Sequence, residues 1–357
     1  MHRFALSFSA LLAPALLAGA PARADFSSCV ASLRAEGERA GISGQTIETA
    51  FSGLQPDMKV LDFQNQQPEF KTPIWDYLAG LVDDERVADG KAAMAREARA
   101  LQRAEETYGV SRTMLAAIWG VESYFGTEMG KRPLVKSLST LACYGGRAGY
   151  FRSELMATLK IIDRGDIPAD RLSGSWAGAF GQTQFMPSSY LRFAEDYDGD
   201  GKRDIWSTPA DIFASIANYM HGNGWMGGAT WGREVSVSAE ARRRIANEIP
   251  RRDGPCQARR DMTSVLPASR WRELGVRTLT GDALPEETPN AALVTGESRA
   301  FLVFRNYDAL LEYNCAHSYA IGVGLLADAL TPGAPPVAKA VSQKSKRPAK
   351  RKTSRKS

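Results

Sequence analysis

The chain contains the stretch Ser111-Arg-Thr-Met-Leu-Ala-Ala-Ile-Trp-Gly-Val-Glu-Ser-Tyr-Phe-Gly126, which has the spacing of a buried helix. Ser111 can cap its start, and Gly126 can end it. One face carries, at three- and four-residue intervals, Leu115, Ile118, Trp119 and Glu122. A carboxylate therefore lies on the apolar stripe of this predicted helix.

Glu122 is the first candidate for chemistry. Burying an unpaired carboxylate is costly, and the negative end of the helix also disfavours the anion, so we expect a raised pKa. A glutamic acid that stays protonated near neutral pH can act as a general acid. The same pattern also fits a helix-end residue that bends into solvent or pairs with an arginine.

Helical spacing extends over most of the chain. It predicts further helices over residues 29–40, 43–52, 75–84, 90–108, 151–164, 211–220 and 308–329. Alternating or short apolar runs predict strands over 233–238, 275–280, 292–295 and 300–304. The predicted fold class is therefore mainly α (α+β), with a small β-containing insert.

Both ends of the chain differ in composition from the rest. An apolar run from Phe4 to Ala20 precedes Ala22-Arg-Ala24, which predicts a signal peptide cleaved after Ala24 and an exported protein without stable membrane insertion. After Pro336 the chain has nine lysines and arginines and no acidic residue, so we expect a disordered basic tail. This tail could adhere to an anionic envelope surface or simply aid solubility.

The basic character of the whole chain comes from its ends. The formal charge is +5, but the tail contributes nine positive charges and residues 1–24 two more, so the body between them has a net charge of −6. This balance argues against nucleic-acid binding. Four cysteines, Cys29, Cys143, Cys256 and Cys315, allow two disulfides in any of three pairings. Three histidines, one within the predicted signal peptide, leave little material for a zinc site or a Ser-His-Asp triad.

Residues 173–190 mix small residues with amides, hydroxyls and aromatic rings. Small residues let a backbone approach a ligand closely, whereas amides and aromatic faces suit sugar rings. The segment therefore predicts one wall of a saccharide groove. It also fits a tight turn between helices, with Pro187 starting the second helix.

Five blocks resemble the membrane-bound lytic murein transglycosylase B family (glycoside hydrolase family 103 type), in order and approximate spacing. They are Trp119-Gly-Val-Glu-Ser-Tyr-Phe-Gly126, Ala177-Gly-Ala-Phe-Gly-Gln-Thr-Gln-Phe-Met-Pro-Ser-Ser-Tyr190, Asp198-Gly-Asp-Gly201 with Trp206, Ala217-Asn-Tyr219 and Tyr313-Asn314. The resemblance covers about Asp25 to Leu330. It implies a lysozyme-like helical core and cleavage of the MurNAc-β-1,4-GlcNAc bond of peptidoglycan to a 1,6-anhydro product. It also implies that Glu122 is the sole acid and base, and that the substrate is bound by Ser175, Gln184, Tyr313 and Asn314.

An acidic loop follows the predicted saccharide wall. Residues 196–204 place carboxylates at positions 1, 3, 5 and 9 and a glycine at position 6, as in the first half of an EF-hand calcium loop. The expected ligands of a structural Ca²⁺ are Asp196, Asp198, Asp200, the backbone carbonyl of Lys202, and Asp211. Position 12 is Ser207 instead of glutamate, and Asp211 also fits a helix start after Pro209. No organic cofactor is expected.

These patterns together predict the following organisation: a signal peptide (1–24), a helical N-terminal region (25–108), a catalytic core (109–231) with the EF-hand-like loop (196–211), a β-containing insert (232–305), a C-terminal helical part of the core (306–330) and the basic tail (331–357). A lytic transglycosylase in the periplasm is the leading functional hypothesis. A hydrolytic muramidase and a non-catalytic peptidoglycan-binding scaffold are the alternatives. For His317 the sequence suggests nothing beyond packing.

Overall fold

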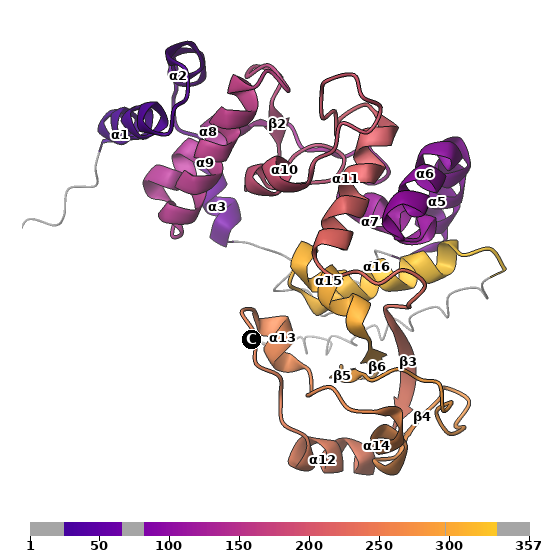
Figure 1. Cartoon of the computed structure of the whole chain (residues 1–357). Coiled ribbons are helices and arrows are strands. Elements are labelled where there is room, and N and C mark those ends of the chain that lie inside the picture. The colour runs from indigo at the N-terminus through magenta and orange to yellow at the C-terminus, as the bar shows by residue number, and fades with distance from the viewer. Residues whose placement is uncertain (1–24, 66–81, 297, 334–357) are drawn as a thin grey trace, which may run out of the picture.

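The computed structural model describes residues 25–65, 82–296 and 298–333. The predicted signal peptide, most of the tail and most of the helix expected at 75–84 lie outside these residues. The N-terminal region contains α1 (Phe26–Arg39), α2 (Gly44–Phe51), α3 (Lys59–Asn65), α5 (Asp84–Arg96) and α6 (Ala98–Tyr108). Figure 1 shows α1 and α2 at one end of the molecule and α5 and α6 at the other.

The middle of the chain forms a helical core around α7. Its helices are α7 (Arg112–Ser123), α8 (Leu134–Tyr144), α9 (Ala148–Asp163), α10 (Pro187–Phe193) and α11 (Pro209–Gly222). Two short antiparallel strands, β1 (Arg132–Pro133) and β2 (Ser173–Gly174), tie the segment after α7 to the predicted saccharide wall. α8 packs on α9, and α11 packs on α6.

A small antiparallel sheet follows, with strand order β4-β3-β6-β5. This region contains β3 (Gly232–Val237), α12 (Ala239–Glu248), α13 (Gln257–Asp261), α14 (Ala268–Glu273), β4 (Val276–Arg277), β5 (Ala292–Thr295) and β6 (Ala300–Val303). Because side chains alternate along a strand, Val294 and Phe301 join the large hydrophobic cluster of the molecule, whereas Leu293 and Leu302 join a second cluster within the insert. The sheet therefore separates two hydrophobic cores.

Two helices end the described chain. α15 (Arg305–Tyr313) and α16 (His317–Leu330) lie between the helical core and the sheet in Figure 1. α16 is buried along most of its length and packs against α7, the helix of Glu122. Residues far apart in the sequence therefore meet around the end of α7.

The expected mainly helical fold with a small β insert is confirmed, and the differences are local. The run expected at 90–108 is two helices, because Glu97 leaves the helical conformation at the junction. The run expected at 308–329 is broken by extended backbone at Asn314 and Ala316. Five of the described helices were not predicted: α3, α8, α12, α13 and α14. α8 is buried on nearly all sides, and α12 buries only Ala241 and Ile245, so neither shows a clear apolar stripe. α3, α13 and α14 have only 7, 5 and 6 residues, too few to show a helical period.

The structure pairs all four cysteines. One disulfide joins Cys29 of α1 to Cys143 of α8, and the other joins Cys256, next to α13, to Cys315, between α15 and α16. Each bridge therefore links segments that are separate in the sequence. None of the described helices is both long enough and apolar enough to span a membrane.

Candidate active site

Glu122 lies in the last turn of α7. Ser111 caps the start of this helix through its side chain, as the sequence predicts, and the helix ends at Ser123. Tyr124 and Phe125 then adopt left-handed conformations, with φ of 46° and 55°. Such angles are uncommon for aromatic residues, so the chain turns sharply directly after the carboxylate.

Three tyrosines from three other helices surround this carboxylate. Tyr313 lies at the end of α15 and Tyr319 in the first turn of α16, and their rings stack with centroids 6.1 Å apart. Tyr219 of α11 lies against Tyr313, with centroids 4.6 Å apart. The negative charge of Glu122, when present, raises the pKa of all three phenols, after the larger effect of burial.

The surroundings of Glu122 favour its neutral form. Burial raises its pKa from 4.5 to about 8, and the Tyr319 hydroxyl opposes this in part. That hydroxyl makes no hydrogen bond of ordinary geometry, although it lies close enough to the carboxyl to lower its pKa. The side chain keeps partial access to solvent. Glu122 is therefore a protonated, reachable acid at neutral pH, as expected from its place on the apolar face, and not an arginine-paired surface residue.

Tyr313 also connects the carboxylate to the predicted saccharide wall. Its hydroxyl donates to the backbone carbonyl of Thr183, with 2.7 Å between oxygens. The neighbouring Gln184 has a left-handed backbone (φ 49°), and its side-chain amide donates to the carbonyls of Gly181 (2.8 Å) and Met129 (3.2 Å). The amide group of Gln184 is therefore held in place, and its oxygen accepts no hydrogen bond from the described part of the chain.

Ser175 belongs to a tight turn in the same wall. Its hydroxyl oxygen accepts the backbone N–H of Ala179 (3.0 Å), and its own N–H donates to the Ala179 carbonyl (2.7 Å). A Cβ at Gly174 would lie 2.2 Å from that carbonyl, so only glycine fits. The segment is therefore a tight turn, as the second interpretation expects, while its role as the wall of a saccharide groove stays a prediction.

Gln182, which the sequence groups with Gln184, has a structural role. Its side-chain oxygen accepts the indole N–H of Trp119 (2.7 Å), and its amide donates to the carbonyl of Trp206 (2.7 Å). The Ser123 hydroxyl donates to the backbone carbonyl of Gln182 (2.8 Å). These bonds fasten the wall to α7 directly beside Glu122.

Asn314 follows Tyr313 and is exposed. Its backbone N–H donates to Leu310 (3.2 Å), and its side chain makes no hydrogen bond within the described part of the protein. The structure therefore gathers Glu122 and Tyr313, places Gln184 on the adjoining wall, and leaves Asn314 at its edge.

Tyr319 and Tyr219 complete the surroundings of Glu122 but were not among the candidate site residues. The signal for Tyr319 in the sequence was a lone phenol directly before the apolar run from Ala320 to Leu326. An aromatic residue in such a run is usually part of the core, and Tyr319 is indeed only 3% exposed. Its relation to Glu122 depends on how α16 packs on α7.

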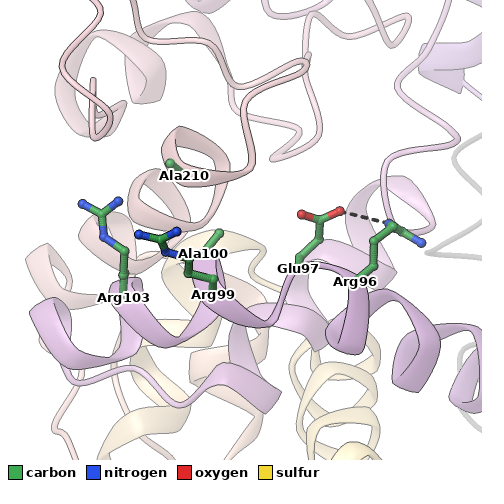
Figure 2. A pocket seen from close by; sticks show the side chains of 6 residues that line it. All are labelled: Arg96, Glu97, Arg99, Ala100, Arg103 and Ala210. Carbon is green, nitrogen blue, oxygen red and sulfur yellow. Dashed lines mark hydrogen bonds and ion pairs between the residues drawn. The ribbon is translucent and has the colours of Figure 1, made fainter.

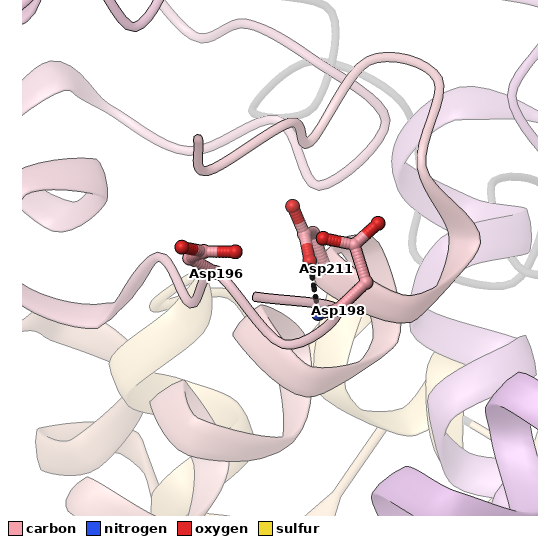
Figure 3. Close-up of side chains that lie close together, drawn as sticks. All are labelled: Asp196, Asp198 and Asp211. Carbon is pink, nitrogen blue, oxygen red and sulfur yellow. Dashed lines mark hydrogen bonds between the residues drawn. The ribbon is translucent and has the colours of Figure 1, made fainter. Parts of the chain in front are cut away.

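The acidic loop brings three of its predicted ligands together. Carboxylate oxygens of Asp196, Asp198 and Asp211 lie within 4.8 Å of one another (Figure 3). Gly199 and Gly201 have positive φ, 79° and 90°, which lets the loop turn tightly around this point. Several carboxylate oxygens at one point are the donors that Ca²⁺ prefers, so these residues fit a calcium ion.

The buried Asp211 also organises the loop. Its carboxylate accepts backbone N–H groups from Tyr197 (2.7 Å), Asp204 (2.8 Å) and Asp198 (3.4 Å). Burial raises its pKa, and these three hydrogen bonds oppose the rise. Asp200 lies outside the converging group and accepts the Lys202 N–H (2.8 Å).

A hollow of about 240 Å³ lies beside the acidic loop (Figure 2), lined by Arg96, Glu97, Arg99, Ala100, Arg103 and Ala210. It contains none of the predicted site residues. The Arg103 guanidinium lies 4.8 Å from the centre of the Tyr197 ring, and the Tyr197 hydroxyl lies 2.6 Å from that of Thr107. The arginine-rich face of α6 thus supports the acidic loop from outside.

The mainly helical fold holds one protonated carboxyl group at a helix end, beside a wall of glycines and amides, an arrangement suited to general acid catalysis. Residues 25–328 match the model of the family described as "Transglycosylase SLT domain". The chain belongs to this family.

Known proteins with similar sequences and structures agree with this placement. The chain is 36% identical over 192 residues to the membrane-bound lytic murein transglycosylase B of Escherichia coli K12, an alignment that spans 52% of this chain and about half (53%) of that relative. SltB3 of Pseudomonas aeruginosa in complex with NAG-anhNAM-pentapeptide matches with a TM-score of 0.78 and 39% identity, over 88% of this chain and 81% of SltB3. The E. coli lytic transglycosylase Slt35 in complex with calcium matches with a TM-score of 0.70 and 27% identity, over 85% and 92%.

Proposed function

We propose that the protein is a lytic transglycosylase that cleaves the MurNAc-β-1,4-GlcNAc bond of peptidoglycan and leaves a 1,6-anhydro-MurNAc end. The observation that carries this proposal is the position of Glu122 at the end of α7, among Tyr219, Tyr313 and Tyr319, where burial raises its pKa to about 8. An acid that is protonated at neutral pH can give its proton to the glycosidic oxygen. The complex of the related SltB3 with an anhydro sugar supports this product class.

Glu122 acts twice in the proposed reaction. As a neutral acid it protonates the leaving oxygen while the sugar ring develops oxocarbenium character. As a carboxylate it then takes the proton of the muramyl C6 hydroxyl, whose oxygen bonds to C1 of the same sugar. The attack is intramolecular, so its effective concentration is high and no ordered water is needed. One carboxylate therefore suffices for both steps.

The remaining site residues bind and orient the strand. Gln184 presents its side-chain oxygen, Ser175 its hydroxyl hydrogen, and the exposed Asn314 its whole amide group, all suited to the hydroxyl and acetamido groups of the sugars. Tyr313 holds the wall through Thr183 and excludes water from one side of Glu122. Exclusion of water keeps the acid neutral until substrate arrives.

A calcium ion in the acidic loop is part of the proposal. Asp196, Asp198 and Asp211 would hold it, with Asp200 and the Lys202 carbonyl completing the set. Bound Ca²⁺ would offset the repulsion among these carboxylates. The complex of the related Slt35 with calcium supports this assignment. The role is structural, because the loop joins the saccharide wall to α11, which carries Tyr219.

We place the protein in the periplasm, exported by residues 1–24 and cleaved after Ala24. The apolar run and the Ala22-Arg-Ala24 site support export. The disulfide pairing of all four cysteines supports an oxidising compartment.

The products formed from purified sacculi test the reaction. We expect mass spectrometry to show muropeptides that are lighter by one water than hydrolysis products and that have no reducing end. Products with a reducing end would instead identify a hydrolytic muramidase. Binding of sacculi without release of any muropeptide would identify a scaffold.

Replacing Tyr319 by Phe should shift the pH profile upward. The Tyr319 hydroxyl lowers the pKa of Glu122, so its removal leaves burial unopposed and raises that pKa further above about 8. Glu122 must be protonated in the first step, so activity should persist to higher pH than in the wild type. The measurement is the rate of muropeptide release between pH 6 and 10; an alkaline limb that moves to lower pH would contradict the assignment.

A further inference from the structure

The corner between α15 and α16 carries two of the three tyrosines that surround the proposed acid. Tyr313 and Asn314 end α15, Cys315 and Ala316 form the turn, and Tyr319 lies in the first turn of α16. Extended backbone at Asn314 and Ala316 interrupts the helical hydrogen bonding at this corner. Contacts with other segments therefore also contribute to the positions of the two tyrosines.

The side of the corner that faces the site is held by two tyrosine hydroxyls. Tyr313 donates to the Thr183 carbonyl (2.7 Å), and Tyr219 donates to the carbonyl of Glu312 (2.7 Å). These bonds join the corner to the saccharide wall and to α11. Each is a single hydrogen bond that water can replace if the corner moves away.

The opposite side of the corner is held by α13, which belongs to the insert. The Cys256–Cys315 disulfide joins the residue before α13 to the turn itself. Arg259 of α13 donates to the Glu312 carboxylate (2.6 Å) and to the carbonyl of Asp308 (3.2 Å). A covalent bond and two hydrogen bonds from one arginine nitrogen therefore link α13 and the residue before it to the corner.

Further contacts show that the segment around α13, from Arg252 to Met262, packs as part of the core. Ala258 of α13 and Met262, the residue after this helix, belong to the large hydrophobic cluster and not to the separate cluster of the insert. Arg252 makes an ion pair with Asp308 of α15, with a shortest N···O distance of 3.0 Å. His317 is neutral at physiological pH because burial lowers its pKa to about 4, and its Nδ1 lies 2.8 Å from the Tyr307 hydroxyl.

We propose that α13 and the Cys256–Cys315 disulfide form a clamp that positions Tyr313 and Tyr319 against Glu122, so that the insert controls the catalytic power of the site. This inference rests on the proposed function and assigns Cys256, Cys315 and Arg259 as positioning residues. Without the clamp the corner separates from the wall, water reaches the carboxyl group, and the acid loses the surroundings that keep it protonated. Misplacement by about 1 Å can cost roughly a hundredfold in rate.

The second disulfide provides a matched control. Cys29–Cys143 joins α1 to α8, and all four cysteines are half-buried. The control bridge closes the longer loop, 114 residues against 59, so its removal should cost at least as much stability. A purely stabilising role predicts that activity follows stability in both variants. The clamp predicts that only the Cys256–Cys315 bridge matters for the rate.

The experiment compares full-length Cys256→Ser/Cys315→Ser with Cys29→Ser/Cys143→Ser and the wild type, by melting temperature and by muropeptide release across pH. We expect kcat of the first variant to fall roughly tenfold or more, with its alkaline limb moved to lower pH. The second variant should keep the wild-type kcat and pH profile despite an equal or greater fall in melting temperature. Reductant should inactivate the wild type and the second variant but change the first no further.

Hydrogen exchange supplies a readout that does not depend on activity. Residues 312–319 should exchange faster in Cys256→Ser/Cys315→Ser than in the wild type, and at the wild-type rate in the control. Wild-type kcat, pH profile and exchange in the first variant would overturn the clamp, as would equal losses of activity in both variants. If the wild type released no muropeptides but residues 312–319 still exchanged faster in the first variant, the proposed reaction would be refuted and the positioning role of the clamp would be retained.

Discussion

Glu122→Gln should abolish muropeptide release while binding to sacculi persists. Gln has the same shape but can neither give nor take a proton, so both steps of the proposed reaction lose their catalyst. General acid–base catalysis contributes about 10²–10⁴-fold, and the same group acts in both steps, so we expect a loss of at least roughly a thousandfold in kcat. The measurement is release of anhydro-muropeptides, with co-sedimentation to follow binding.

Glu128→Gln is the matched control. Glu128 lies six residues after Glu122 and is exposed. Its only hydrogen bond to α7 runs from its backbone N–H to the Ser123 carbonyl (2.8 Å). Its replacement makes the same Glu-to-Gln change close to the same end of the helix, and activity should stay within about twofold of the wild type, as for most surface changes. Equal losses in the two variants would show that Glu122 has no specific role as the acid.

The same Glu122 variant should be more stable than the wild type in alkaline solution. The pKa of Glu122 is raised from 4.5 in the unfolded chain to about 8 in the fold, so ionisation costs stability as pH rises through this window. Gln is neutral at every pH and avoids that cost. The two proteins should melt together at pH 4, and Glu122→Gln should melt higher at pH 9. A lower melting temperature at pH 9 would contradict a buried, neutral acid.

Asp211→Ala should produce the largest loss of stability among the changes in the acidic loop. It leaves the backbone N–H groups of Tyr197, Asp198 and Asp204 without their acceptor, and it empties the space of a side chain that has no exposure to solvent. Each unsatisfied buried donor costs about 1–3 kcal/mol, and relief from burying a carboxylate offsets part of the sum, so we expect about 3–5 kcal/mol. Thermal and urea unfolding in the presence of a chelator measure this loss without the metal.

Calcium separates the two roles of Asp211. In the wild type, a chelator should lower the melting temperature and calcium should restore it, since a ligand at 100 times its Kd stabilises by about 2.7 kcal/mol. Asp211→Ala should show no response to calcium. Asp200→Asn keeps an oxygen that accepts the Lys202 N–H, so with chelator present its melting temperature should equal that of the wild type. Because one calcium ligand is weakened, a higher calcium concentration should be needed to raise that melting temperature. A full calcium response in Asp211→Ala would remove this residue from the ligand set.

The local features of this protein could be predicted from its sequence because they depend on neighbouring residues. The cap at Ser111 follows from a single residue type, the apolar face with Glu122 from three- and four-residue spacing, and β3 from two-residue alternation. β5 and β6 were predicted as short apolar runs. The motif blocks identified the family for the same reason, since each is short and contiguous. The converging aspartates, Asp196, Asp198 and Asp211, were found because the loop spans only 16 residues.

The surroundings of Glu122 depend instead on contacts between distant segments. Tyr313 and Thr183 are 130 residues apart, and Tyr319 reaches the carboxyl group only because α16 packs on α7. The structural role of Gln182 and the choice among three disulfide pairings also depend on which helices become neighbours. Packing fixes such contacts by shape and burial, which no local pattern encodes. The residues on α7 show that Glu122 is an acid on an apolar face, and the assembled helices exclude enough water to raise its pKa to about 8.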